Sequence, residues 1–353
     1  MDVTYQFVNY GEVLKPAEDV LALDVGMKTI PGVIDHHHPQ AEVECTASLI
    51  IKHPHLVLDH IKREDKTGKK RGSIQLCIIT HRLPDFDSIS SVFLALKLIE
   101  TGKVDTHMEN MARYVKMVDS ATLPKNIDLT STPYSILRSL HTEIKREKED
   151  VNLQRMKEGL KFMNFLYSRS EEGYDIIENR ILFSGIDRYE RAMRRVENDY
   201  FNYLADVKKA RKIMLSLPKT TERNRIQVDG LVIKNPKSFL LREWARRDRE
   251  NPSLRDGFSF LMTNFWDHRY ILGVDPEKGV NLKGLGDLLN ERELEKRNET
   301  ERPFVFRWYD GDCPFFNFRI IDSPQDGTEL SQEEIEDVLL FFSQMGTFPE
   351  VPP

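Results

Sequence analysis

The segment from residue 73 to residue 101 constrains the fold of this chain more than any other. Its first part, Ser73–Thr80, is a nearly continuous apolar run, which is typical of a strand buried in a parallel sheet. Its second part, Asp85–Thr101, has apolar residues at helical spacing and is followed by Gly102, a common helix stop. A buried strand that leads through a short loop into an amphipathic helix predicts an α/β fold.

Two further apolar runs earlier in the chain each end in an acid. These are Val20–Asp24 and Gly32–Asp35, and Leu56–Asp59 is a candidate third strand of the same form. Ligands of such sheets bind at the carboxyl ends of the strands, which is where these acids fall. We therefore expect residues 1–130 to form a catalytic domain with a mainly parallel sheet.

The remaining chain changes character twice. From about Tyr134 to Leu217 it consists of charged helical segments, Ser135–Ser168 and Arg188–Leu215, so residues 131–218 are predicted to be a helical connector or cap. After Pro218 short strand patterns alternate with helical ones, which predicts a second, smaller α/β domain for substrate recognition at 219–353. The expected strands are Ile226–Val232, Phe258–Asn264, Arg269–Val274, Phe304–Trp308 and Phe315–Ile321, and the expected helices are Ser238–Arg249, Leu282–Arg297 and Ser331–Ser343.

Length and composition limit the class of protein. A chain of 353 residues is long enough for more than one domain, and 40% hydrophobic with 31% charged residues is ordinary for a globular protein. The net charge of -6 argues against a protein that coats nucleic acid. The amino terminus lacks the pattern of a signal peptide, and no apolar run is long enough for a membrane span. The three separated cysteines include no CxxC pair, so we expect buried thiols and a cytoplasmic protein.

The loop that joins the strong strand to its helix carries three potential metal ligands. In the segment 80–91, THRLPDFDSISS, His81 is followed by Asp85 and Asp87. Two carboxylates at this spacing repel each other, and a divalent cation would offset that repulsion. Mixed imidazole and carboxylate ligation suits manganese, iron, zinc or magnesium, and manganese matches oxygen-rich sites well.

A second group of candidate ligands lies at 35–38, where Asp35 is followed by three histidines. Neighbouring residues of an extended chain point to opposite sides, so the three imidazoles cannot all reach one ion. We expect one ligand, one substrate contact and one bystander, and we interpret His38 as a partly exposed loop residue. Asp24 and Asp119 each end an apolar segment, and taken singly each is better explained as a helix cap or a turn residue than as a ligand.

Together these residues resemble the DHH phosphoesterase superfamily, which includes exopolyphosphatase-like and oligonucleotide phosphoesterase-like enzymes. The family combines a HxxxDxD loop, a solitary aspartate, a DHH triplet and a further aspartate, and all four are present here between about residues 18 and 125. Residues 41–51, AEVECTASLII, also look like the helix start that follows the triplet in the family. The order departs from the family, because the HxxxDxD loop comes after the triplet. The chain therefore looks like a circularly permuted DHH domain.

The resemblance implies a metal-dependent phosphohydrolase with two divalent ions, Mn2+ or else Mg2+ or another divalent metal, ~3.5–4 Å apart. One ion would be held by His81, Asp85 and a bridging Asp24, and the other by Asp24, His36, Asp87 and Asp119. A water between the ions would attack phosphorus. His37 would contact the phosphate and protonate the leaving oxygen, and Asp35 would orient a histidine.

The substrate is less constrained than the reaction. Members of the family act on polyphosphate, pyrophosphate, short oligonucleotides, cyclic dinucleotides or single-stranded DNA. The acidic net charge favours a small phosphorylated substrate, whereas the basic loop at 62–72 favours short nucleic acid, with a solvated hairpin as its plainer interpretation. A nucleotide-binding regulatory module with little or no turnover is the alternative function, and a homodimer is left open.

The second half of the chain lacks the glycine- and histidine-rich stretch of the family's usual companion domain. Its candidate substrate-binding residues are Arg269, Lys283, Gly284 and Gly286, because a glycine-containing loop before a helix can hold an anion. An ordinary turn with surface lysines is the competing interpretation. The segment Arg307–Gly311 is a second candidate for substrate contact, with a tight turn among core aromatics as its alternative.

Overall fold

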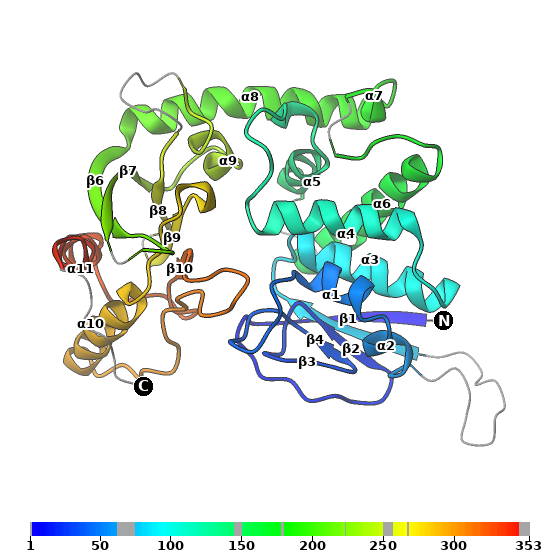
Figure 1. Ribbon diagram of the computed structural model, residues 1–353, viewed down its shortest axis with the longest axis horizontal. Coiled ribbons are helices and arrows are strands. Elements are labelled where there is room, and N and C mark those ends of the chain that lie inside the picture. Colours follow the sequence, from blue (N-terminus) through cyan, green and yellow to red (C-terminus); the bar gives the residue numbers. More distant parts are fainter. Residues whose placement is uncertain are drawn as a thin grey trace. The chain divides into compact units, whose positions relative to one another are not determined.

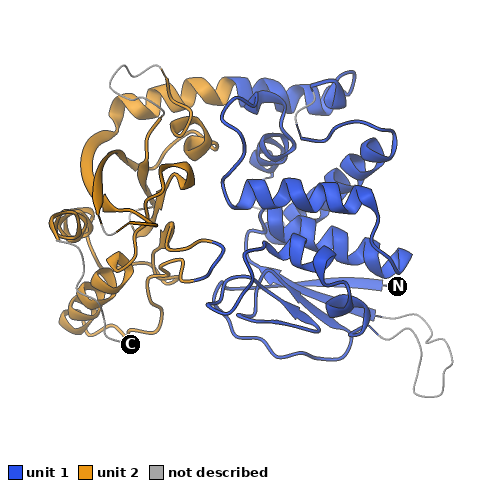
Figure 2. Cartoon of the chain, viewed as in Figure 1, with its two compact units in different colours: residues 1–197, 313–315 blue, residues 198–312, 316–353 orange. Residues whose placement is uncertain are grey.

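The computed structural model describes the chain at 2–61, 75–144, 150–177, 180–222, 224–249, 257–266 and 268–345 (Figure 1). Within these ranges it is a mixed α/β protein with eleven α-helices and two five-stranded sheets, of which one is mainly parallel. The chain divides into two compact units, 1–197 with 313–315 and 198–312 with 316–353 (Figure 2). The basic loop at 62–72 lies outside the described residues. None of the described helices has the length and apolar character needed to cross a membrane.

The sheet of unit 1 explains why the strong apolar run is central. Its strand order is β1-β5-β2-β4-β3, and every neighbouring pair is parallel except β3 with β4. β5 lies between β1 and β2, and its residues Leu76 and Ile78 are fully buried. The strands are β1 (Asp2–Val8), β2 (Val20–Leu23), β3 (Thr29–Ile30), β4 (Val33–Ile34) and β5 (Gln75–His81).

Helices α1, α3, α4 and α6 pack on one another above this sheet in the view of Figure 1, with α1 and α4 against α3 and α6 against both α3 and α4. Local sequence sets their ends: Asp85 caps the start of α3, and Gly102 ends it with a φ of 71°. Gly159 of α6 permits the close packing, because a Cβ there would stand 2.6 Å from Ile89 of α3. The helices are α1 (Thr46–Lys52), α2 (His55–Leu58), α3 (Phe86–Thr101), α4 (Thr106–Asp119), α5 (Pro133–Thr142), α6 (Val151–Glu171) and α7 (Arg180–Phe183).

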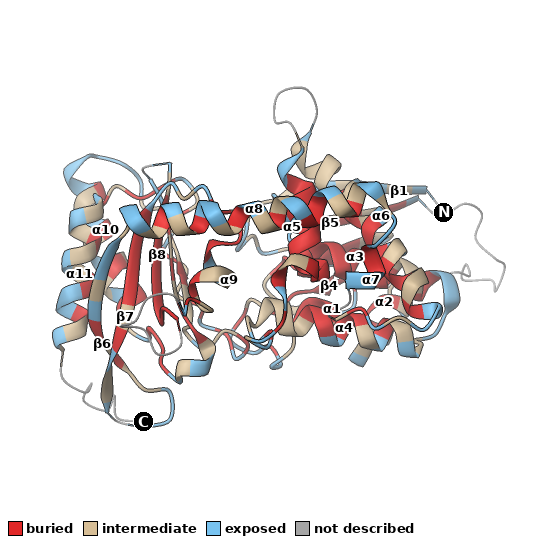
Figure 3. Cartoon of the chain, turned by 90° about the horizontal axis from the view of Figure 1, so that it is seen from above, coloured by how far each residue is buried: buried red, intermediate tan, exposed pale blue. Residues whose placement is uncertain are grey.

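Unit 2 is built on the second sheet, whose order is β10-β9-β8-β7-β6 with only β7 and β8 parallel. Figure 3 shows β8 almost wholly buried, which agrees with its apolar sequence, Phe260–Phe265. The division between the units falls within α8 (Asp187–Lys209). The other elements are β6 (Arg211–Pro218), β7 (Arg225–Lys234), β8 (Phe260–Phe265), β9 (Arg269–Val274), β10 (Ile320–Asp322), α9 (Leu241–Ala245), α10 (Leu285–Glu299) and α11 (Gln332–Gln344).

Five element predictions were wrong. The helix expected at Ser238–Arg249 shortens to the five residues of α9. The run Leu56–Asp59 forms the short helix α2 instead of a strand, because a four-residue apolar run does not distinguish the two. The helix expected to reach Leu215 ends at Lys209, and β6 follows because its alternating side chains pair along β7. No described strand covers 304–308, and only an isolated bridge at Tyr309 lies nearby. The strand expected at 315–321 shrinks to β10, because Asn317 and Phe318 adopt left-handed backbone.

Candidate metal centre

Parallel pairing in unit 1 brings several candidate ligands to one edge of the sheet. Asp24 directly follows β2, Asp35 directly follows β4, and His81 is the last residue of β5. Since β2 pairs in parallel with both β4 and β5, the carboxyl ends of the three strands meet. Two helices complete the group, because Asp87 lies in the first turn of α3 and Asp119 is the last residue of α4.

Asp24 occupies the centre of the group. Its side chain is buried, and its backbone has a φ of 61°, a left-handed conformation that costs about 1–2 kcal/mol for a residue with a side chain. One carboxylate oxygen, Oδ1, lies 3.4 Å from Nδ1 of His36, and the other, Oδ2, lies 3.2 Å from Nε2 of His81. The same carboxylate therefore faces two histidines, one at the end of β5 and one in the segment that follows β4.

The first potential ligand group consists of Asp24, His81 and Asp85, whose ligand atoms all lie within 4.8 Å of one another. His81 donates a hydrogen bond from Nδ1 to the carbonyl of Arg82 at 2.9 Å, so Nε2 is the nitrogen that faces the two carboxylates. Burial lowers the pKa of His81, but Asp24 and Asp85 outweigh it and raise that pKa to about 10. The surroundings thus favour a positive charge at Nε2, whether a proton or a metal ion.

The second potential group consists of His36, Asp87 and Asp119. Thr46 donates from Oγ1 to Asp24, so the same hydroxyl accepts the hydrogen of Nδ1 of His36, 3.0 Å away. Burial, and then the charge of His37, lower the pKa of His36 to about 3, so the ring is neutral.

Nε2 of the neutral His36 ring then presents a lone pair to the carboxylate oxygen Oδ2 of Asp119, only 3.3 Å away. Two acceptors at this distance repel unless a cation or a proton lies with them.

Asp87 adds to the excess of negative charge at this edge. It is buried at 2% exposure, and burial together with Asp24 and Asp85 holds the pKa of its carboxyl well above the usual value. Its oxygens accept hydrogen bonds from the amides of Thr46 and Ala47 at 2.9 and 3.0 Å, at the start of α1. A cation would relieve the repulsion among these acids, so the donor set fits a divalent metal.

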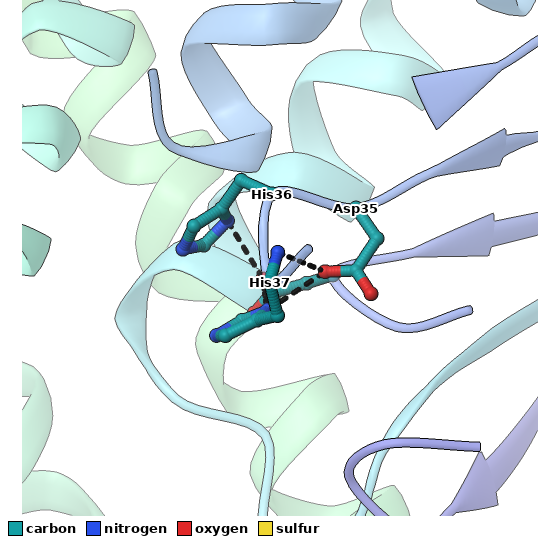
Figure 4. Close-up of side chains that lie close together, drawn as sticks. Asp35, His36 and His37 are labelled. Atoms are coloured by element: carbon teal, nitrogen blue, oxygen red, sulfur yellow. Dashed lines mark hydrogen bonds and ion pairs between the residues drawn. The ribbon is translucent and has the colours of Figure 1, made fainter. Parts of the chain in front are cut away.

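Asp35 holds the ring of His37 in one orientation. Nδ1 of His37 donates to Oδ1 of Asp35 at 2.7 Å, and Figure 4 shows the two side chains pointing toward each other. The other oxygen of Asp35 accepts the amide of Met27, so the buried carboxylate is itself fixed. Burial lowers the pKa of His37, but Asp35 and then Asp24 raise it to about 9. His37 is therefore positively charged near neutral pH.

His38 has a different role from the one that its sequence suggests. It is buried at 7% exposure, so the expectation of a partly exposed loop residue was wrong. Its Nε2 lies 3.0 Å from the hydroxyl of Thr29, which also donates to the carbonyl of Asp35. His38 thus supports the turn after β4 that positions the other two histidines.

Three residues of the site were missed in the sequence. Tyr10 stacks on His81 with ring centroids 4.0 Å apart, and its hydroxyl lies 2.9 Å from Nε2 of that histidine. Thr46 bridges Asp24 and His36, and Phe315 lies with its ring 4.9 Å from His36. Only Thr46 had a signal, because it lies in the segment that resembles the family's helix start. Tyr10 and Phe315 reach the group through tertiary contacts alone.

The predicted substrate-binding residues of unit 2 come from two places along the chain. Arg269 begins β9 and donates to the carbonyl of Gln325, whereas the other three follow that strand in the chain, around the start of α10. Lys283 lies over the ring of Phe318, and Gly284 begins α10 with a φ of 89°.

Gly286 serves packing, because a Cβ there would collide with the side chain of Asp310. An acid therefore lies beside the start of α10, which opposes anion binding at that helix end. In the second candidate segment, Trp308 is buried and donates to Glu293, and Gly311 has a φ of 66°. The turn with a core aromatic thus describes this segment.

Comparison with known proteins identifies no family for the chain. No protein-family model matches it. No curated protein matches its sequence either. The case for a function therefore depends on the arrangement of the site.

Proposed function

We propose that this protein is a divalent-metal-dependent phosphohydrolase of the DHH type, in which unit 1 carries a circularly permuted catalytic domain. The observation that carries the proposal is the pair formed by His36 and Asp119. A neutral ring directs a lone pair at a carboxylate oxygen 3.3 Å away, and a metal ion would convert this repulsion into ligation. The buried acids Asp24 and Asp87 beside the pair strengthen the case, since buried carboxylates that lie close together repel each other.

The residues divide between two cations that would share Asp24. His81, Asp85 and Asp24 would hold one, and His36, Asp87, Asp119 and Asp24 would hold the other. Imidazole with several carboxylates suits Mn2+, with Mg2+ or another divalent metal as substitutes. When bound, such cations acidify water and neutralise charge on a phosphoryl group.

The chain's own residues supply the remaining chemistry. His37 is positively charged and 15% exposed, so its ring can contact a phosphoryl oxygen and donate a proton to the leaving oxygen. Asp35 accepts from Nδ1, which leaves Nε2 of His37 as the nitrogen that can reach a substrate. A small phosphorylated compound, such as a polyphosphate, a nucleotide or a short oligonucleotide, is the substrate class that we propose.

The permuted motif order is compatible with this site. The HxxxDxD loop follows β5, which is late in the sequence but adjacent to β2 in the sheet. Spatial neighbours, and not chain order, determine which strand ends meet. In this proposal the helices between residues 131 and 209 act as the connector and unit 2 as the substrate-recognition domain.

The test combines metal binding with turnover. The purified full chain, stripped by a chelator, is titrated with Mn2+ by calorimetry, and phosphate or nucleotide release is measured on a panel of polyphosphate, pyrophosphate, short oligonucleotides and cyclic dinucleotides. We expect tight Mn2+ binding and release from at least one substrate. His36→Gln should lose metal affinity and activity, and Asp59→Asn, which alters an exposed acid at the end of α2, should retain both. A wild-type chain that binds no divalent metal refutes the proposal.

A nucleotide-binding module without turnover is the second candidate. It is favoured by Asp87, whose two oxygens already accept backbone amides of α1. Each carboxylate oxygen has a second lone pair, so helix capping and metal ligation are compatible. Nucleotide binding without any product, in the presence of saturating Mn2+, would support this candidate over the hydrolase.

A further inference from the structure

Thr46 lies at the point where the two potential ligand groups meet. It is the first residue of α1, and none of its surface is exposed to solvent. Its hydroxyl donates to Oδ1 of Asp24 at 3.1 Å, and the same oxygen lies 3.0 Å from Nδ1 of His36. Asp24 belongs to the first group and His36 to the second, so one hydroxyl joins a ligand of each.

The backbone of Thr46 holds a third candidate ligand. Cys45, which precedes α1, makes no side-chain hydrogen bond to the first turn, so the first amides of the helix need another acceptor. Asp87 of α3 supplies it, because its two oxygens accept the amides of Thr46 and Ala47 at 2.9 and 3.0 Å. The backbone that carries the hydroxyl is thereby fixed to Asp87. Thr46 therefore contacts one ligand of the first group and two of the second.

The hydroxyl determines which nitrogen of His36 carries the ring hydrogen. A hydroxyl has one hydrogen and an ionised carboxylate can only accept, so that hydrogen belongs to the bond with Asp24. Nδ1 of His36 must then donate to the hydroxyl oxygen, because two lone pairs at 3.0 Å would repel. If Nε2 carried the hydrogen instead, it would bond to Asp119, 3.3 Å away, and would have no lone pair for a cation. Thr46 thus keeps the hydrogen off the nitrogen that would ligate.

The hydroxyl also keeps the Asp24 carboxylate between two histidines. Oδ1 of Asp24 is 3.4 Å from Nδ1 of His36, which exceeds the usual N–H···O distance of about 2.9–3.0 Å. Without the hydroxyl, the ring and the carboxylate would attract each other and close that distance. Because the two oxygens belong to one rigid group, Oδ2, now 3.2 Å from Nε2 of His81, would move with Oδ1. The hydroxyl therefore holds Asp24 where it can serve both cations.

We propose that Thr46 is a positioning residue that couples the two cation positions. It acts through His36 and Asp24, and the inference rests on the proposed function. Removal of a contact that orients a metal ligand typically changes metal affinity about 10- to 100-fold. The second ligand group depends on Thr46 through His36, Asp87 and the shared Asp24, whereas the first depends on it through Asp24 alone. The cation of the second group should therefore lose more affinity when the hydroxyl is removed.

The first experiment tests the positioning without metal. The metal-free full chain is labelled with 15N, and NMR reads which imidazole nitrogen carries the hydrogen, with His36→Gln used to assign that ring. The hydrogen of His36 should be on Nδ1 in the wild type and in Thr46→Ser, which retains the hydroxyl. Thr46→Val removes the hydroxyl at nearly the same volume, and the His36 resonances should shift. A hydrogen on Nε2 in the wild type, or His36 resonances that Thr46→Val leaves unchanged, would overturn the proposal.

Thr132→Val is the matched control. Thr132 is also a fully buried threonine of unit 1, and its hydroxyl accepts the amide of Ser135 at the start of α5. Loss of this helix cap should lower the Tm, which circular dichroism measures, but Thr132 is not hydrogen-bonded to any candidate ligand. The His36 resonances and the affinity for Mn2+ should therefore match the wild type. If Thr132→Val reduced the affinity as much as Thr46→Val, the effect would be a general loss of stability and the proposal would fail.

The second experiment adds metal to the full chain. Mn2+ is titrated by calorimetry into the chelator-stripped wild type, Thr46→Ser and Thr46→Val. The first two should bind two Mn2+ ions alike, and in Thr46→Val one of the two ions should bind about 10- to 100-fold more weakly. Wild-type affinity for both ions in Thr46→Val would overturn the coupling and leave the proposed function standing. A wild type with a single Mn2+ site would also overturn the coupling, and one with no divalent-metal site would refute the proposed function as well.

Discussion

Asp119→Asn provides a direct test of whether the acidic cluster exists for a cation. Asp119 is the last residue of α4, where a negative charge opposes the helix dipole, and its carboxylate faces the lone pair of His36. Removal of an unfavourable charge at a helix end is worth about 0.3–1 kcal/mol. Asparagine keeps the shape of the side chain and can also donate to that lone pair. The metal-free variant should therefore be more stable than the wild type.

The same substitution should reduce the response to metal. A cation at about one hundred times its dissociation constant stabilises the folded state by about 2.7 kcal/mol, and a tenfold loss of affinity removes about 1.4 kcal/mol of that. In a unit of this size 1 kcal/mol corresponds to roughly 2–4 °C of Tm. We thus expect the variant to melt about 1–4 °C higher in chelator and to gain about 3–6 °C less from Mn2+.

The assay is thermal unfolding followed by circular dichroism, in chelator and in a Mn2+ series. Glu171→Gln is the matched control, because Glu171 is an exposed acid at the last position of α6 and is not among the candidate ligands. It should show the small gain in chelator with no change in the Mn2+ response. The reasoning would be refuted if Asp119→Asn had a lower Tm than the wild type in chelator, or if Mn2+ raised its Tm as much as it raises that of the wild type.

Three further predictions concern neighbouring residues. Tyr10→Phe removes the hydroxyl beside Nε2 of His81, so the affinity for Mn2+ should be unchanged or up to about tenfold higher. The change in tyrosine absorbance that the wild type shows on Mn2+ addition should disappear in this variant. Weaker Mn2+ binding by the variant would show instead that the hydroxyl assists ligation. The pKa of His37 is raised to about 9, so its contribution to stability is complete below its ordinary value of 6.5 and is lost as pH rises through 9. In Asp35→Asn that loss should disappear. Urea unfolding from pH 6 to pH 9.5 measures the difference in free energy of unfolding between the wild type and this variant, and a difference that did not change with pH would contradict the prediction. Gly159→Ala should cost about 1–3 kcal/mol, because the new Cβ would stand 2.6 Å from an isoleucine of α3; an unchanged urea midpoint would show that the helices separate freely.

The sequence predictions were correct where an element depends on residues close together in the chain, and they failed where it depends on distant ones. The strand at 75–81 and the helix at 86–101 were confirmed, because a continuous apolar run, a capping aspartate and a stop glycine act within a few residues. β1 was missed because alternate residues are exposed along this edge strand, so it lacks a continuous apolar run. Left-handed residues near 317 interrupted a strand that its apolar content had predicted.

The same distinction applies to the candidate site, where the sequence indicated the residues but not the roles of their atoms. Asp24, Asp35 and His81 were found because each stands where a buried strand ends, and that position is readable in the chain. The roles of the individual atoms were not readable. That Nδ1 of His36 is taken by Thr46, and that Nε2 therefore faces Asp119, depends on α1 and α4 lying beside the strand ends.

The sequence by itself determined the α/β character of the chain and the residue types that stand at the strand ends, because hydrophobic periodicity and helix capping are local properties. Only the tertiary structure decided that Asp24 lies between two histidines, that Tyr10 stacks on His81, and that Thr46 bonds to both Asp24 and Asp87. Those relations join residues tens of positions apart, and they depend on which strands pair and which helices pack. No pattern within one segment records that choice.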